Sequence, residues 1–195
     1  HPTMLKAAVE AKSEGICHPI LLGNDEAITK LAKELELSLE GIEIVNLRHP
    51  NEAARRECYA RILSEKRARQ GANFQESNDK MFERNYFGMM MVEVGDADAF
   101  ITGVYTKYSN TIKVAREVIG LQPGFNTFAT MHILNSKKGT YFVADTLINR
   151  HPSKEIMKDI ARLAEKSVRF FNHTPIMAMV SYSNFGTDKN GSAEA

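Results

Sequence analysis

The chain has 195 residues, which is enough to bury one large core or two modest ones. Its hydrophobic fraction of 43% and charged fraction of 25% are ordinary for a globular protein, and its net charge of +1 argues against a general role on nucleic acids or membrane surfaces. No apolar run approaches the ~20 residues that a membrane-spanning helix needs, and no signal peptide is recognisable. We therefore expect a cytoplasmic protein with neither a nucleic-acid nor a membrane partner.

The first half of the chain alternates helix-prone segments with short apolar runs. We predict helices over residues 4–13, 24–35, 51–69 and 81–94, the second of them capped by Asn24 or Asp25. We predict strands over residues 19–23, 42–47 and 97–103. Alternating strands and helices favour an α/β protein with a parallel sheet covered on both faces.

The rhythm changes in the second half. A helix over 111–119 is followed by two predicted strands, 127–134 and 140–148, whose short polar connection is a hairpin signal that makes the sheet mixed. A helix capped by Ser153 then runs to about residue 171. We place a boundary between two α/β subdomains, 1–110 and 111–195. Both ends look cut, because the chain opens inside helix-prone sequence, and we expect a fragment of a longer polypeptide.

The apolar run at residues 176–180 gives way to Ser181, Ser183 and Asn184. This pattern is typical of a buried parallel strand that delivers a polar loop to the carboxyl edge of its sheet. Ligands of open α/β sheets bind beyond that edge. We therefore predict that the three polar side chains donate hydrogen bonds to a ligand.

A second polar loop follows the predicted strand at 97–103 and leads into a helix. The free N–H groups and the dipole of a helix N-terminus favour an anion, and Lys107 adds a positive charge there. An ordinary loop with Ser109 as the N-cap is the alternative. The candidate ligand-binding residues of this loop are Thr106, Lys107, Ser109, Asn110 and Thr111.

A third candidate segment follows the second hairpin strand. Asp145, Asn149 and Arg150 come directly after an apolar run and before a proline. Their polar side chains are placed to line the same cleft. Capping of the strand end is an equally good interpretation.

Other chemical signals are weak. Four of the six histidines precede proline, which mainly restricts the backbone, and none has the helical spacing of a zinc site. No dinucleotide fingerprint, P-loop or serine nucleophile elbow is present. We assign no catalytic residue and no metal ligand, interpret Met89 to Met91 as core filling, and expect Cys17 and Cys58 to be buried reduced thiols.

Three segments in this order resemble the phosphate acetyltransferase and butyryltransferase family: residues 95–103, residues 145–152, and Met179-Val180-Ser181-Tyr182-Ser183. Further motifs resemble one branch, the transferase-like domain at the C-terminus of bacterial NADP-dependent malic enzymes. These are residues 84–88, residues 106–108 and Ser183-Asn184-Phe185-Gly186. The resemblance implies a three-layer α/β/α fold with a mostly parallel, mixed sheet and two subdomains around a cleft, like isocitrate and isopropylmalate dehydrogenases.

The chain departs from the transferases of this family. They usually carry a His-Ser-Thr-type sequence at positions 106–108 and Thr-Lys-Gly at 184–186, neither of which is found here, and they use a Ser-Arg-Gly segment with a downstream aspartate that would lie beyond residue 195. Their reaction needs a base, a cation for phosphate and donors for an oxyanion. The departures favour binding without turnover.

The resemblance implies a regulatory domain that binds acetyl-CoA or an acyl phosphate, mediates homo-oligomerisation, and holds no cofactor itself. NADP and a divalent metal would belong to a separate N-terminal malic-enzyme domain of the same polypeptide, an oxidoreductase. An active phosphate acetyltransferase, which moves acetyl between coenzyme A and phosphate, is one alternative. A non-catalytic structural or oligomerisation domain is the other.

Overall fold

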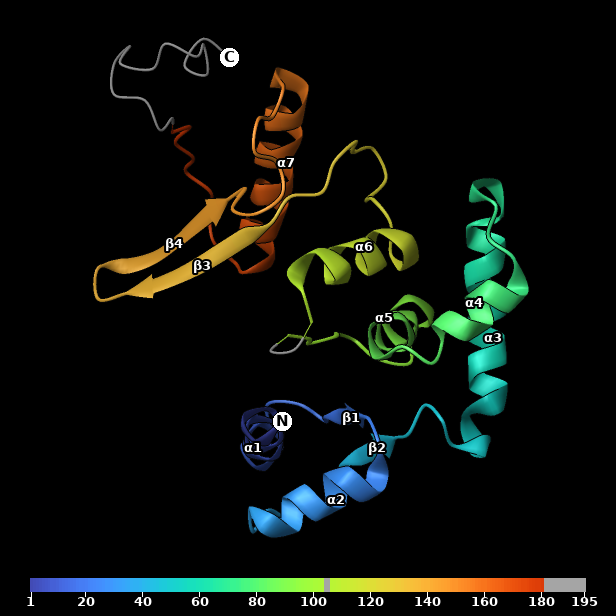
Figure 1. Cartoon of the computed structure of the whole chain (residues 1–195). Coiled ribbons are helices and arrows are strands. Elements are labelled where there is room, and N and C mark those ends of the chain that lie inside the picture. The colour runs from blue at the N-terminus through green and yellow to red at the C-terminus, as the bar shows by residue number, and fades with distance from the viewer. Residues whose placement is uncertain (104–105, 181–195) are drawn as a thin grey trace. The chain divides into compact units, whose positions relative to one another are not determined.

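The computed structural model describes residues 1–103 and 106–180. The chain divides into two compact units, His1–Gly120 and Leu121–Ala195 (Figure 1). Both units combine helices with a small β-sheet, which confirms the predicted α/β class. Within the described ranges, no helix has the length and apolar character required to cross a membrane.

The first unit alternates helices with two short strands before it becomes helical. Its elements are α1 (Pro2–Ser13), β1 (Ile20–Leu22), α2 (Asp25–Glu34), β2 (Glu43–Val45), η1 (Pro50–Glu52), α3 (Ala53–Lys66), η2 (Ala68–Gln70), α4 (Phe74–Lys80), α5 (Arg84–Val94) and α6 (Tyr108–Val118). Strands β1 and β2 are parallel, with Leu21 opposite Ile44. The predicted cap of α2 is confirmed, since the Asn24 side chain accepts a hydrogen bond of 2.7 Å from the Ala27 amide.

The predicted helices are divided more finely than expected. The helix predicted over 51–69 consists of α3 with a 3-10 turn at each end, and Gly71, at φ +81°, follows the second turn. Helix α4 was not predicted, although Asn73 caps it by accepting a hydrogen bond of 2.8 Å from the Glu76 amide. Helix α5 begins at Arg84, three residues later than expected.

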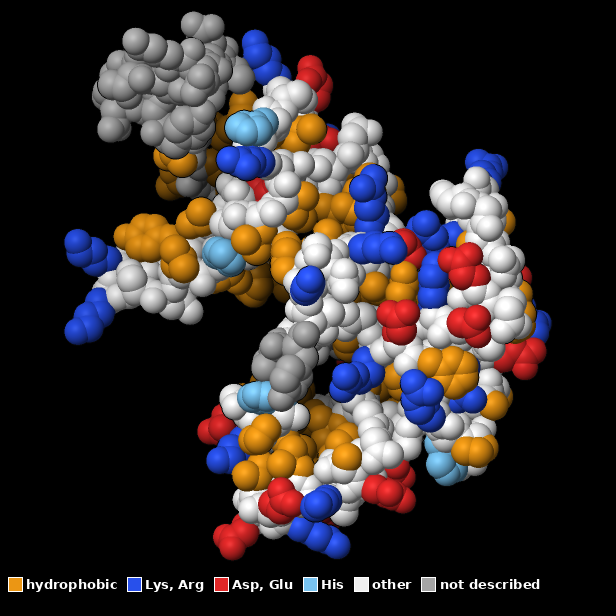
Figure 2. Space-filling view, viewed as in Figure 1, with side chains coloured by type: hydrophobic (Ala, Val, Ile, Leu, Met, Phe, Trp, Pro, Cys, Tyr) orange, Lys and Arg blue, Asp and Glu red, His pale blue; other side chains and the backbone are white. Residues whose placement is uncertain are grey.

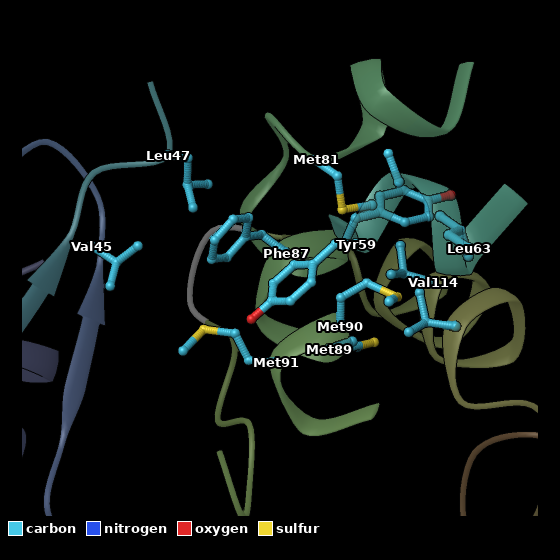
Figure 3. Packing of buried hydrophobic residues seen from close by; sticks show 13 residues of the cluster. Val45, Leu47, Tyr59, Leu63, Met81, Phe87, Met89, Met90, Met91 and Val114 are labelled. Atoms are coloured by element: carbon cyan, nitrogen blue, oxygen red, sulfur yellow. The ribbon is translucent and has the colours of Figure 1, made fainter. Parts of the chain in front are cut away.

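The core of the first unit lies between α3, α5, α6 and the end of β2 (Figure 3). The rings of Tyr59 and Phe87 pack at a tilt of 56° with their centroids 5.1 Å apart, and both side chains are almost completely buried. Met89, Met90 and Met91 are also buried, which confirms their prediction as core filling. The cluster comprises Val45, Leu47, Tyr59, Ala60, Leu63, Met81, Tyr86, Phe87, Met89, Met90, Met91, Val114 and Val118.

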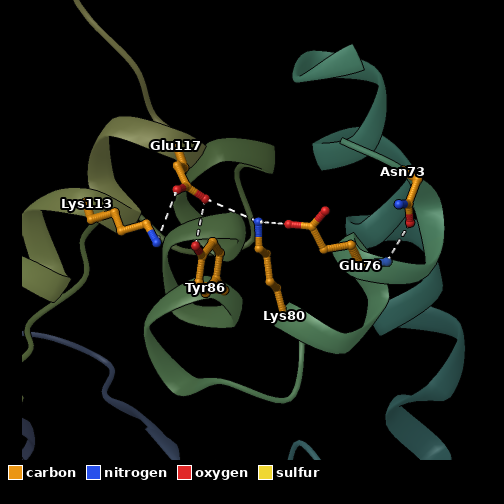
Figure 4. A network of polar contacts seen from close by, with 6 residues as sticks. All are labelled: Asn73, Glu76, Lys80, Tyr86, Lys113 and Glu117. Carbon is orange, nitrogen blue, oxygen red and sulfur yellow. Dashed lines mark hydrogen bonds and ion pairs between the residues drawn. The ribbon is translucent and has the colours of Figure 1, made fainter. Parts of the chain in front are cut away.

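A polar network ties α4, α5 and α6 together beside this core (Figure 4). Glu117 accepts a hydrogen bond of 2.7 Å from the Tyr86 hydroxyl and lies 3.4 Å from the Lys80 ammonium, which also pairs with Glu76 at 2.8 Å. Burial and the hydrogen bond to Glu117 raise the pKa of Tyr86, so its hydroxyl remains a donor at neutral pH. The network therefore fixes α6 on α5.

The second unit is a hairpin with one long helix. Strands β3 (Met131–Ser136) and β4 (Gly139–Ala144) are antiparallel, and α7 (Lys154–Phe170) packs against β4. The predicted cap is confirmed, since the Ile156 amide donates to Ser153 Oγ at 3.3 Å. Figure 2 shows hydrophobic side chains at the surface of the hairpin, next to basic side chains at its two-residue turn.

The predicted single mixed sheet is wrong for the described residues, which form two separate two-stranded sheets. Residues 97–103 form no strand, because side-chain contacts rather than strand pairing hold this segment on α5. Residues 176–180 form no buried strand either, and Ile176 is 97% exposed. A lone extended segment is not stabilised as a strand without a pairing partner, and the described part of the chain places none beside it.

The cysteine prediction is half right. Cys17 and Cys58 are free thiols, as expected, but both are exposed rather than buried. Cys58 lies on the outer face of α3, where the burial pattern turns Tyr59 and Ala60 inward instead. The thiols therefore contribute little to the core.

Candidate functional site

The first candidate site is the start of α6. The helix begins at Tyr108, with Lys107 as its N-cap residue, and the Lys107 side chain makes no capping hydrogen bond. Ser109 therefore lies inside the first turn, and the alternative that it caps the helix is wrong. The backbone turn is closed by the Lys107 carbonyl, which accepts hydrogen bonds from the amides of Asn110 at 3.0 Å and Thr111 at 3.3 Å.

Three contacts with the core fix the segment that leads to this helix. The Tyr59 hydroxyl donates a hydrogen bond to the Asp96 carboxylate, and Thr102 Oγ1 donates to Asn85 Oδ1 at 3.0 Å. Between them, Phe100 packs so closely on Gly88 that a side chain there would overlap its ring. Helices α3 and α5 thus hold this segment between Asp96 and Thr102.

The electrostatics of the α6 start favour an anion. An 11-residue helix places partial positive charge at its first turn, which favours a negatively charged group near that end. Thr106, Lys107, Ser109 and Asn110 are exposed around this end, and Thr111 is half-buried. Within residues 1–103 and 106–180, no acidic side chain pairs with Lys107.

The second candidate site, in the second unit, is the loop after β4. Asp145 and Asn149 lie together, because Asp145 Oδ2 accepts hydrogen bonds of 2.7 Å from both the backbone amide and the side-chain amide of Asn149. Asp145 Oδ1 accepts hydrogen bonds from Thr130, at 2.6 Å from the hydroxyl and 3.0 Å from the backbone amide. Arg150 follows at the surface.

Hydrogen bonding decides the protonation state of Asp145. Partial burial raises the pKa of this carboxyl group, but the hydrogen bonds from Thr130 and Asn149 outweigh burial and hold the pKa well below its usual range. Asp145 is therefore an anion at neutral pH. A group with so low a pKa is a poor general base near pH 7.

The predicted residues thus fall into three groups. Thr106, Lys107, Ser109, Asn110 and Thr111 surround the start of α6 in the first unit, whereas Asp145 and Asn149 form one cluster in the second unit. Ser181, Ser183 and Asn184 lie outside the described residues. Thr130, the partner of Asp145, was missed, because a lone threonine before a strand carries no chemical signal in the sequence.

Metal binding receives no support from the described ranges. Within residues 1–103 and 106–180, no three histidine, cysteine, aspartate or glutamate side chains are grouped so that they could hold a metal ion.

Comparison with known proteins identifies the family. The family model described as phosphate acetyl/butaryl transferase matches residues 1–195. The chain belongs to this family. The sequence-based recognition is therefore confirmed, and the relatives of the chain include both kinds of protein that the motifs resemble.

Two relatives illustrate the range of the family. The phosphate acetyltransferase of Helicobacter pylori is 33% identical over 92% of the chain and 34% of its own length. The NADP-dependent malic enzyme of Salmonella typhimurium is 29% identical over 97% of the chain and 25% of its own length. The chain thus spans about a third or less of these two relatives.

Solved structures agree with the family assignment. A phosphotransacetylase from Streptococcus pyogenes matches with a TM-score of 0.81 and 26% identity, over 97% of the chain and 57% of that protein. The EutD phosphotransacetylase from Staphylococcus aureus matches with a TM-score of 0.75 and 26% identity, over 95% of the chain and 55% of that protein. The chain therefore has the fold of the matched part of these phosphotransacetylases.

Proposed function

We propose that this chain is the phosphotransacetylase-like domain of an NADP-dependent malic enzyme, and that it binds acetyl-CoA or a related acyl phosphate without transferase turnover. The observation that carries the proposal is the engagement of Asp145. Its carboxylate is ionised and surrounded by donors from its own loop and from Thr130, so it is unsuited to accept a proton from a thiol.

Ligand binding is supported by the start of α6. Coenzyme A and acyl phosphates share phosphate oxygens, which are strong acceptors for backbone N–H groups and for a lysine ammonium. Lys107 supplies an exposed ammonium, and the partial positive charge at the first turn of α6 favours the same anionic group. The hydroxyl and amide groups of Ser109 and Asn110 add further donors at the same end.

The regulatory part of the proposal follows from the malic-enzyme relatives. A domain that binds an acyl ligand without consuming it is suited to sensing that ligand for a catalytic domain elsewhere in the polypeptide. We propose that NADP and a divalent metal act only in that separate malic-enzyme domain, and that the cytoplasmic protein is a homo-oligomer. We further propose the three-layer, two-subdomain architecture shared with isocitrate and isopropylmalate dehydrogenases.

One observation favours a second candidate, an active phosphate acetyltransferase. The Helicobacter pylori relative with that name is 33% identical to the chain, compared with 29% for the Salmonella typhimurium malic enzyme. Transfer of acetyl between coenzyme A and phosphate would then need a base other than Asp145.

Calorimetric titration with acetyl-CoA tests ligand binding. We expect saturable heat for the wild-type chain and roughly tenfold weaker binding for Lys107→Gln, because loss of one charged hydrogen bond has about this effect. Lys113→Gln is the matched control, since Lys113 lies on the same helix, is exposed and pairs only weakly with Glu117, at 3.9 Å. Absence of heat at millimolar acetyl-CoA would refute the proposed binding.

A thiol-release assay separates the two candidates. The wild-type chain is mixed with acetyl-CoA and inorganic phosphate, and free coenzyme A is followed with a thiol reagent. We expect no release above the rate without protein. Turnover comparable to that of a phosphate acetyltransferase assayed in parallel would replace the regulatory proposal with the catalytic one.

A further inference from the structure

We infer that Asp145 is a positioning residue, which shapes the loop after β4 for a ligand through hydrogen bonds within the loop rather than by contacting the ligand itself. The inference rests on the proposed function, because the acyl ligand of that function is taken as the ligand of this loop. It assigns shaping of the loop and contact with the ligand to different residues, whereas the sequence pattern gave the same role to all of them.

The first observation is the number of donors around this carboxylate. In addition to Thr130 and Asn149, the amides of Leu147 and Ile148 point at Oδ1, at 3.3 and 3.4 Å. Three consecutive backbone amides, from residue 147 to residue 149, therefore converge on one side chain. A carboxylate surrounded in this way has little acceptor capacity left for a ligand.

The second observation is that Asn149 is engaged to the same extent. Its side-chain amide donates to the Phe128 carbonyl at 2.8 Å and to Asp145, and its Oδ1 accepts a hydrogen bond of 3.1 Å from the Thr127 hydroxyl. Asn149 thus connects the end of the loop to the strand-entry segment at residues 127–128. Both polar residues that looked like ligand contacts are used to hold backbone.

The third observation is which side chains of the loop remain outside this cluster. Leu147 is 55% exposed, and Arg150 is exposed and has no ion pair within residues 1–103 and 106–180. An apolar group and a guanidinium separated by two residues suit the apolar and anionic parts of an acyl-CoA or acyl phosphate. The hydrogen bonds of Asp145 hold the backbone that carries both.

The charge of Asp145 is essential to this role. Every neighbour within hydrogen-bond distance is a donor to it, so an asparagine of the same shape would direct an NH2 group at other N–H groups. Asp145→Asn therefore removes the charge and one acceptor while it preserves the volume. We expect the loop to lose its fixed shape while the hairpin remains folded.

The test measures both the rigidity of the loop and the affinity for the ligand. Amide hydrogen exchange, followed by NMR on the full chain, reports Leu147, Ile148 and Asn149 individually. We expect these three amides to exchange roughly tenfold faster or more in Asp145→Asn, and acetyl-CoA to bind roughly tenfold more weakly. Both measurements are made at a temperature at which each variant is fully folded.

Thr140→Val is the matched control. Thr140 donates a hydrogen bond of 2.8 Å to Asn135 near the other end of the same hairpin, so its loss disturbs the hairpin without touching the loop. We expect wild-type affinity for acetyl-CoA in this variant. If Asp145→Asn fails to fold, Thr130→Val serves in its place, since it removes the hydroxyl that donates to Asp145 and accepts from the amides of Thr146 and Leu147.

The outcomes distinguish the inference from the function on which it rests. Binding within twofold of wild type in Asp145→Asn, or unchanged exchange of the three amides, would overturn the positioning role while the proposed function stands. Equal weakening by Thr140→Val would reduce the role to general stability and overturn it as well. If the wild-type chain itself fails to bind acetyl-CoA, the proposed function is refuted, and the ligand role of Asp145 is refuted with it.

Discussion

Gly88 offers a sharp test of how the segment before α6 is held. In the middle of α5, Gly88→Ala would ordinarily stabilise the helix by about 1 kcal/mol, because glycine is the more costly residue in a helix interior. Here we expect the opposite sign. A Cβ at this position would lie 2.6 Å from Cδ2 and 2.9 Å from Cζ of Phe100, and closer still to Cε2.

The magnitude follows from these distances. Carbon atoms in contact normally lie ~3.5–4.0 Å apart, so the Phe100 ring must move by roughly 1 Å. Phe100 packs against the buried cluster around Phe87, which limits that movement. Overpacking of this kind costs about 1–3 kcal/mol, and subtraction of the gain of about 1 kcal/mol in helix propensity leaves a net loss of up to about 2 kcal/mol.

Urea unfolding of four proteins measures the effect: wild type, Gly88→Ala, Phe100→Ala and the double variant. In the Phe100→Ala background the obstruction is gone, so Gly88→Ala should stabilise by about 1 kcal/mol. The sign of the glycine substitution therefore reverses with the residue at position 100. Stabilisation by Gly88→Ala in the presence of Phe100 would refute the close packing of this segment on α5.

Three further predictions concern individual polar groups. Tyr86→Phe should lower the free energy of unfolding by about 1.5–3 kcal/mol in urea titrations, because Glu117 loses a charged hydrogen bond; an unchanged midpoint would contradict the network. Since folding lowers the pKa of Asp145, its stabilisation should be complete above about pH 4 and decline as the pH falls further. Asp145→Asn should remove that part of the acid dependence, and identical acid-unfolding curves would contradict it. Ser153→Ala should cost about 1 kcal/mol in thermal unfolding through loss of the α7 cap, whereas a wild-type melting temperature would exclude that role.

Much of the fold could be predicted from local sequence. Caps such as Asn24 and Ser153 act over three residues, so their side chains mark helix starts directly. The strand predicted at 97–103 failed, because Phe100 packs on Gly88 and Thr102 donates a hydrogen bond to Asn85, so α5 rather than a neighbouring strand holds the segment. A short apolar run can form either a strand or an irregular segment packed on a helix, and only tertiary contacts decide which of the two forms.

The residues of the candidate site could be predicted from the sequence, but their structural roles could not. Asp145 and Asn149 were identified from their place after an apolar strand, yet Asp145 also accepts a hydrogen bond from Thr130, 15 residues earlier, which the sequence pattern did not indicate. Lys107 was predicted as a cation before a helix, and the structure adds that the helix begins directly after it. Such pairs cannot be recognised in the sequence, because their members are far apart along the chain and become neighbours only when it folds.

The contact between Asp145 and Thr130 also governs how the hairpin tolerates change during evolution and engineering. A slip of one residue between β3 and β4 would turn every side chain to the opposite face. The hydrogen bond between Asp145 and Thr130 joins the two strands just beyond Met131 and Ala144, the last pair of the ladder. It therefore fixes the alignment of β3 and β4 at the end away from the turn. The turn itself, at Lys137 and Lys138, is therefore not needed to fix the alignment of the strands. Insertions there, including a peptide tag or a fluorescent reporter, should leave the strand alignment intact.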